Sequence, residues 1–171
     1  MRSLLFILLT AAIITSCNKD EGEQFADEIV GTWSLVAGTG EYETTTVTPD
    51  YTASAETISQ VVDPTTYELE LSSDGTLRSR GSITYDVVET MDGQTYPSTV
   101  TMSGLVGDGT YRVMGNRLIT KDTKGIEFEL TIVSLTGTEL VVSKETNQSL
   151  SGGGSSSETW QKDTQVYERV D

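Results

Sequence analysis

The chain has 171 residues, with 11 Lys and Arg, 26 Asp and Glu and no His, so its formal charge is −15. This length suits one domain, and the acidity argues against nucleic acid as a partner because phosphate binding depends on Lys and Arg. With no His and one Cys, the chain lacks His-dependent nucleophiles, His-bearing zinc or haem sites and an intrachain disulfide, and we expect no metal and no cofactor.

Residues 1–16 have the features of a signal peptide. Arg2 precedes an apolar run over residues 4–14. At 1.5 Å per residue this run spans about 16 Å, half of a bilayer's hydrocarbon core, which is too short for a permanent transmembrane helix. Residues 14–17 (Ile-Thr-Ser-Cys) resemble the lipobox of bacterial lipoproteins. The resemblance implies cleavage before Cys17 and several acyl chains on it, which together give stable membrane anchoring.

The polar residues 17–28 are expected to form a lipidated, acidic tether. Their start, residues 17–21 (Cys-Asn-Lys-Asp-Glu), is similar to the export signal that carries some Gram-negative lipoproteins to the outer face of the outer membrane. A solvated linker explains the same residues equally well, because acid-rich linkers often follow lipobox cysteines. We therefore expect an outer-membrane lipoprotein on either the periplasmic face or the cell surface.

From Ile29 onward, apolar and polar residues alternate with period two, which predicts β-strands. Strands are expected near residues 67–71, 83–87, 99–103, 111–113, 126–132 and 140–142, and turns at residues 73–75, 91–94, 115–116 and 136–137. Each strand has one apolar face, and no strong helix could cover it. An antiparallel meander closed into a β-barrel of about 8–10 strands would bury that face, and a two-sheet sandwich would satisfy the same alternation.

Two stretches have weaker patterns. Residues 43–62 are rich in Thr and interrupted by Pro49, and we expect a loose strand pair there, with a short helix over residues 54–62 as the alternative. Residues 151–157 (Ser-Gly-Gly-Gly-Ser-Ser-Ser) predict a flexible loop. The remaining residues, 158–171, are then best placed as the strand that closes the barrel.

Residues 29–35 (Ile-Val-Gly-Thr-Trp-Ser-Leu) resemble the Gly-x-Trp signature that opens the first strand of lipocalins and of lipocalin-like domains in bacterial lipoproteins. Three later hairpins resemble those of the family in the same order, at residues 67–76, 109–118 and 132–140. The resemblance implies a lipocalin-like barrel over residues 29–171, in which Gly31 allows a tight backbone turn and Trp33 fills the closed end. The disulfide cysteines and C-terminal helix of animal lipocalins are missing, so their ligands do not carry over.

The side chains predicted to face inward could line a pocket or fill a solid core, because an eight-stranded barrel holds either its own side chains or one small ligand. Candidate ligand contacts among them are Tyr67, Leu69, Tyr85, Met102, Tyr111, Phe128 and Leu130. The other inward positions are Leu35, Leu71, Ile83, Val100, Val113 and Leu140. Buried tyrosine hydroxyls need partners, which favours a pocket shared by Tyr67, Tyr85 and Tyr111.

We expect carboxylates such as Glu68, Glu70, Glu127 and Glu129 on the outer face, and no acid in the inward register. The function predicted from the sequence is therefore binding of a small apolar or amphipathic molecule by a monomer, without catalysis, in a cavity of roughly 300 Å³ or more. The alternative is an interaction module with a solid barrel, whose acidic outer face or loops at 38–64 and 148–157 contact another envelope protein or a glycan.

Overall fold

The computed structural model describes residues 21–63, 67–102 and 106–170, so the signal segment and Cys17 lie outside the described residues. The described elements are α1 (Glu21–Glu28), β1 (Gly31–Val47), β2 (Thr52–Asp63), β3 (Glu68–Leu71), β4 (Thr76–Arg80), β5 (Ile83–Met91), β6 (Gln94–Met102), β7 (Gly109–Met114), β8 (Arg117–Asp122), β9 (Glu127–Leu135), β10 (Glu139–Gly152) and β11 (Ser155–Val170). All strand pairings are antiparallel and the expected turns are present, but the order is not a simple meander, because β1 pairs with β3, β2 with β5 and β4 with β7.

The strands form a closed barrel at one end because β1 pairs along nearly its whole length with β11. Eight strands make the ring, in the order β1, β3, β4, β7, β8, β9, β10 and β11. The other edge of β1 is divided between two partners: residues 31–34 pair with β3, and residues 39–47 pair with β2. The closed antiparallel barrel is thus confirmed, and β2, β5 and β6 form a branch outside its ring.

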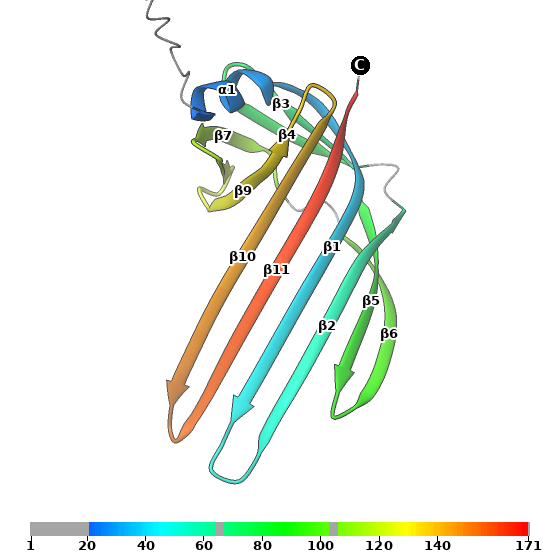
Figure 1. Ribbon diagram of the computed structural model, residues 1–171, viewed down its shortest axis with the longest axis vertical. Helices are drawn as coiled ribbons and strands as arrows, with labels where there is room; N and C mark the ends of the chain where they lie inside the picture. Colours follow the sequence, from blue (N-terminus) through cyan, green and yellow to red (C-terminus); the bar gives the residue numbers. More distant parts are fainter. Residues whose placement is uncertain (1–20, 64–66, 103–105, 171) are drawn as a thin grey trace, which may run out of the picture.

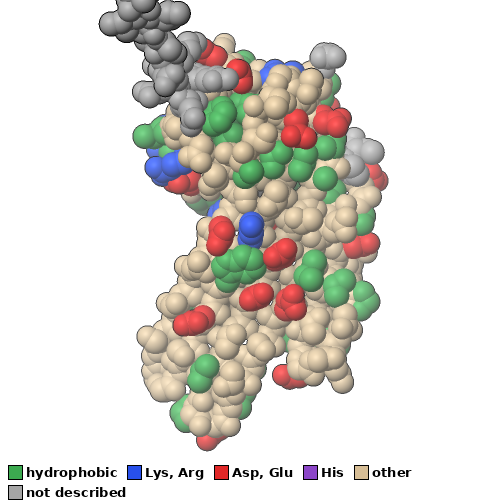
Figure 2. All heavy atoms as spheres, in the orientation of Figure 1, with side chains coloured by type: hydrophobic (Ala, Val, Ile, Leu, Met, Phe, Trp, Pro, Cys, Tyr) green, Lys and Arg blue, Asp and Glu red, His purple; other side chains and the backbone are tan. Residues whose placement is uncertain are grey.

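Beyond the ring, the sheet continues as an open trough made of β10, β11, β1, β2, β5 and β6. Figure 1 shows β10, β11, β1 and β2 running together well past the compact end of the molecule, with β5 and β6 beside β2. One border of the trough is β6, which pairs only with β5, and the other is β10, which pairs with β9 only at residues 140–143. On the face shown in Figure 2, the far ends of the long strands carry few charged or hydrophobic side chains.

The hydrophobic core fills the ring. Trp33, Tyr67 and Tyr167 are its largest fully buried side chains, and the rings of the two tyrosines lie 6.5 Å apart. Three core side chains come from the branch strands and pack against those of the ring: Val61 on β2, and Ile83 and Tyr85 on β5. The other core residues are Ile29, Leu35, Leu69, Leu71, Leu77, Val106, Leu118, Ile132, Leu140 and Val142. Trp33 donates its indole hydrogen to the carbonyl of Ile29 at 2.8 Å, which gives the polar atom of this fully buried side chain a partner.

Arg169 connects several elements at the closed end of the barrel. Its guanidinium lies 4.3 Å from the centre of the Trp33 ring and donates to the carbonyls of Glu28, Val30 and Gly137 at 2.5, 2.8 and 2.7 Å. These contacts join the last strand to the end of α1, to the start of β1 and to the turn between β9 and β10. A Cβ on Gly31, whose φ is +150°, would lie 2.3 Å from Nη1 of Arg169, so only glycine leaves room for the guanidinium.

Two segments differ from the expectation of irregular chain. The strands β10 and β11 continue to Gly152 and from Ser155, so the loop expected at residues 151–157 is a tight turn at Gly153 and Gly154 with φ of +60° and +84°. Pairing between β10 and β11, and of residues 156 and 157 with β1, satisfies the backbone of this Ser- and Gly-rich stretch despite its weak strand propensity. The stretches 38–64 and 148–157 were expected as exposed loops, but their described residues, 38–63 and 148–157, are likewise mostly strand. The strand pair expected at 43–62 is the hairpin of β1 and β2.

The segment expected as a tether also contains structure. Residues 21–28 form α1, which lies against β7 at the closed end, and Phe25 packs on the hydrophobic core. The backbone N–H of Ile29 donates to the carbonyl of Phe25 at 3.0 Å and continues this helical turn into the domain. The folded unit therefore begins before Ile29.

Replacing Arg169 with Met is expected to lower the free energy of unfolding by roughly 3 kcal/mol, because three carbonyl acceptors lose a charged donor and Trp33 loses its cation. Urea denaturation measures the loss. Arg112→Met serves as control, since its ion pair with Glu127 is exposed and contributes about 1 kcal/mol or less. Equal stability of the Arg169→Met variant and the wild type would contradict the role given to Arg169.

Candidate functional site

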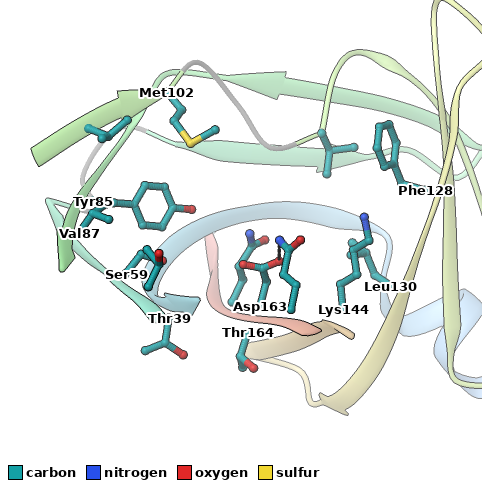
Figure 3. A pocket seen from close by; sticks show the side chains of 15 residues that line it. Thr39, Ser59, Tyr85, Val87, Met102, Phe128, Leu130, Lys144, Asp163 and Thr164 are labelled. Atoms are coloured by element: carbon teal, nitrogen blue, oxygen red, sulfur yellow. Dashed lines mark hydrogen bonds between the residues drawn. The ribbon is translucent and has the colours of Figure 1, made fainter. Parts of the chain in front are cut away.

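A cavity of about 410 Å³ lies in the trough, next to the core and open to solvent on one side. It is lined by residues of β1, β2, β5, β6, β9, β10 and β11 and by Val106. Figure 3 shows Tyr85, Met102 and Phe128 pointing into a common space, whereas Thr39 and Thr164 point away from it. The division of β1 between two partners creates this space, because the branch strands bend away from the ring and leave the interior unfilled.

One wall of the cavity is apolar. It consists of Tyr85 and Val87 on β5, Val100 and Met102 on β6, Val106, and Phe128 and Leu130 on β9. Val100 and Met102 face the cavity, yet each remains 43% exposed, because β6 is the border of the trough. Both residues therefore face the interior as predicted, but a fully closed barrel would have buried them, whereas the open border of the trough leaves them partly exposed.

The opposite wall is polar. It consists of Gln161, Asp163 and Gln165 on β11, Ser59 on β2 and Lys144 on β10, and Figure 3 shows Asp163 between Ser59 and Lys144. The side-chain amide of Gln161 donates to Oδ2 of Asp163 at 2.7 Å. A Cβ on Gly40 would lie 2.8 Å from Oδ1 of Asp163 and 2.5 Å from the hydroxyl of Ser59, so glycine here lets both polar groups lie on the cavity floor.

Asp163 overturns the expectation that no acid shares the inward register. On β11 it alternates with Gln161, Gln165 and the buried Tyr167, and it faces Gly40 across the strand pair. The predicted outward acids behave as expected, because Glu127 and Glu129 are exposed and pair with Arg112 and Arg117. Asp163 could not be recognised in the same way, because its neighbours on the inward face of β11 are the polar Gln161 and Gln165. Without an alternation of apolar residues, the sequence does not show which face of this strand points inward.

Tyr85 joins the two walls. Burial, and then the negative charge of Asp163, raise the pKa of Tyr85 from its ordinary value near 10 to about 12. Burial likewise raises the pKa of Tyr111 and, much more strongly, that of Tyr167. At neutral pH, Tyr85 therefore presents an uncharged hydroxyl to the cavity.

Four of the seven predicted ligand contacts line the cavity: Tyr85, Met102, Phe128 and Leu130. The other three belong elsewhere. Leu69 and Tyr67 are buried in the core, where the Tyr67 hydroxyl donates to the carbonyl of Val106 at 3.5 Å. Tyr111 donates to the carbonyl of Ser72 at 2.8 Å. The prediction that Tyr67, Tyr85 and Tyr111 share one cavity is wrong, because Tyr67 and Tyr111 pack in the ring and Tyr85 lies on the branch.

The polar residues of the site were not singled out from the sequence. Lys144 follows Leu140 and Val142 at two-residue steps, and a cation that continues an apolar register is a signal that could have marked it. Gln161, Asp163 and Gln165 carry no comparable signal, since a run of alternating polar residues is also typical of a solvated strand.

Within residues 21–63, 67–102 and 106–170, no three acidic or cysteine side chains gather in a group that could hold a metal ion. The part of the chain that the structure describes also contains no helix with the length and apolar character needed to cross a membrane.

Comparison with known proteins finds a match to the model of a family described as the lipocalin-like domain, over residues 29–142. No curated protein matches the sequence at a significant level. A solved structure titled S-type phycobiliprotein lyase CPES from Guillardia theta is similar at 10% identity, with 88% of this chain and 96% of that chain covered and a TM-score of 0.24. A likeness this slight transfers neither a ligand nor an activity.

The raised pKa of Tyr85 makes a testable contribution to stability. Since the native-state pKa exceeds the unfolded value, this contribution is complete below pH 10 and is lost as the pH rises from 10 toward about 12. In an ultraviolet absorbance titration, the wild type minus Tyr85→Phe difference should show one ionisation near pH 12. The unfolding free energy of Tyr85→Phe should also fall less steeply over this range. A difference ionisation centred near pH 10 would contradict the burial of this hydroxyl.

Proposed function

This chain belongs to the lipocalin-like domain family, and from that premise we propose that it is a binding protein that holds one small amphipathic molecule in the cavity of the trough. The observation that carries the proposal is the division of the cavity into two unlike walls. The apolar wall on β5, β6 and β9 suits a hydrocarbon body, and the polar wall on β10 and β11 suits a head group.

The size of the cavity agrees with this function. Its 410 Å³ exceed the expected minimum and lie within the range of about 300–1,000 Å³ that is usual for small-molecule sites. The alternative interaction module required an interior filled by side chains, whereas the described residues leave this space between the walls. Ligand binding is therefore the better supported of the two functions.

Filling the cavity should abolish binding. We expect the neutral fluorophore N-phenyl-1-naphthylamine to increase its emission with the wild-type protein, because it would leave water for the apolar wall. Val87→Trp places an indole in the cavity and should weaken this binding at least tenfold. Val88→Trp is the matched control, because its side chain lies on the opposite face of β5 and is 38% exposed. Equal binding by both variants would contradict the site.

We also propose that the protein is anchored in the outer membrane through lipid on Cys17. The lipobox resemblance of residues 14–17 supports this location. Residues 18–20 separate Cys17 from the start of α1, and an extended chain of that length reaches about 14 Å. Because α1 lies at the closed end (Figure 1), such an anchor would hold that end near the membrane and direct the trough away from it.

The anchor is tested by metabolic labelling with palmitate. The wild-type chain should incorporate label and fractionate with membranes, and Cys17→Ala should lose both properties. Surface proteolysis of intact cells, with Lys19→Ala for comparison, then distinguishes the cell surface from the periplasmic face. Retention of label by Cys17→Ala would refute the anchor and leave the binding site untouched.

A further inference from the structure

The ring and the trough separate where β9 leaves β10. The two strands pair only between residues 131–135 and 140–143; beyond this point β9 stays with β8, and β10 continues with β11. The gap is bordered by Phe128 on β9 and Lys144 on β10. We call it the β9–β10 split.

A second hollow of about 280 Å³ lies at the split, on the outer side of the sheet. Phe128 and Lys144 line both this hollow and the cavity, so they stand between the interior and the outer surface. On the face shown in Figure 2, a basic and a hydrophobic side chain lie side by side below β9, among acidic ones. At the split, Phe128 and Lys144 thus lie at the boundary between the cavity and this hollow.

The acids around the split already have partners. Glu127 and Glu129 pair with Arg112 and Arg117, and Glu145 accepts a hydrogen bond from the indole of Trp160 at 3.0 Å. Inside the cavity, Asp163 accepts from Gln161. Arginines thus neutralise Glu127 and Glu129, whereas Glu145 and Asp163 keep their negative charge and accept hydrogen bonds from neutral donors.

Unlike these acids, the Lys144 side chain has no hydrogen-bond or ion-pair partner in the described part of the chain. It is half-buried, and its ammonium lies 5.4 Å from the centre of the Phe128 ring. Although Lys144 and Asp163 are cross-strand neighbours, Lys144 forms no ion pair among the residues that the structure describes. In Figure 3 the Lys144 nitrogen is directed away from Asp163. The ammonium keeps its hydrogen-bonding capacity at the border of an apolar wall.

We propose that Lys144 binds the anionic head group of an amphiphile at the β9–β10 split, while the hydrocarbon chain of that ligand lies along Val87, Val100 and Met102. This inference rests on the proposed function and specifies its ligand class. Asp163 supports the orientation, because its carboxylate repels an anion from the cavity floor and leaves Lys144 as the favourable position. A charge-assisted hydrogen bond from Lys144 in a partly desolvated site would favour an amphiphile with an anionic head group over one with a neutral head group.

Three probes with the same chain length separate the head-group effect from the chain effect: dodecanoate, 1-dodecanol and dodecylammonium. Isothermal titration calorimetry below the micellar range should show that the wild type binds dodecanoate about tenfold more tightly than dodecanol. Lys144→Met should lower the dodecanoate affinity about tenfold and leave the dodecanol affinity within about twofold, since only the charged contact is removed.

Lys162→Met is the matched control. Lys162 lies on β11 next to the same hairpin, but it is exposed and does not line the cavity. Its replacement removes the same charge from the protein and should leave the affinities for both probes unchanged. Circular dichroism checks the fold, and Lys144→Gln gives the same comparison if the Met variant does not fold.

The outcomes separate the two proposals. Undiminished dodecanoate binding by a folded Lys144→Met or Lys144→Gln variant would overturn the role of Lys144, while binding that Val87→Trp blocks would still support the cavity. Tighter binding of dodecylammonium than of dodecanoate would also overturn it, and would assign the head group to Asp163. Failure of the wild type to bind any of the probes or N-phenyl-1-naphthylamine would overturn both proposals.

Discussion

The fold depends on the contact of Arg169 with Trp33 and with three backbone carbonyls at the closed end of the barrel. The guanidinium covers an indole that is fully buried, and its hydrogen bonds reach α1, the start of β1 and the turn after β9. These groups come from opposite ends of the chain, so one side chain ties the first strand to the last. Gly31 makes the contact possible because any larger residue would occupy the position of the guanidinium.

Closure at that end leaves the other end of β1 free to take a different partner. Because β1 pairs first with β3 and then with β2, the same strand belongs to a packed ring and to an open trough. The ring contains most of the buried side chains and supplies stability. The trough is less well packed and holds the cavity. The first residues of β1 therefore belong to the part of the protein that stabilises the fold, and its later residues belong to the part that holds the cavity.

The chemistry of the cavity follows from this arrangement. Strands β5, β6 and β9 bring apolar side chains from one side, and β10 and β11 extend past the ring and bring polar ones from the other. Gly40 has no side chain, which leaves space on the cavity floor for the side chains of Asp163 and Ser59. Tyr85, between the walls, stays uncharged because burial and the nearby carboxylate of Asp163 raise its pKa. A molecule with one apolar and one polar end matches such a site better than a purely apolar one.

The sequence by itself determined the strands, most turns and the family, because alternation and turn residues are local signals that persist in the fold. It also identified Tyr85, Met102, Phe128 and Leu130, whose apolar register is visible along their own strands. Only the tertiary structure decided that Tyr67 and Tyr111 lie outside the cavity, and that Lys144 and Asp163 line it. These placements depend on the divided pairing of β1 and on the separation of β9 from β10, which are long-range choices that no local pattern records.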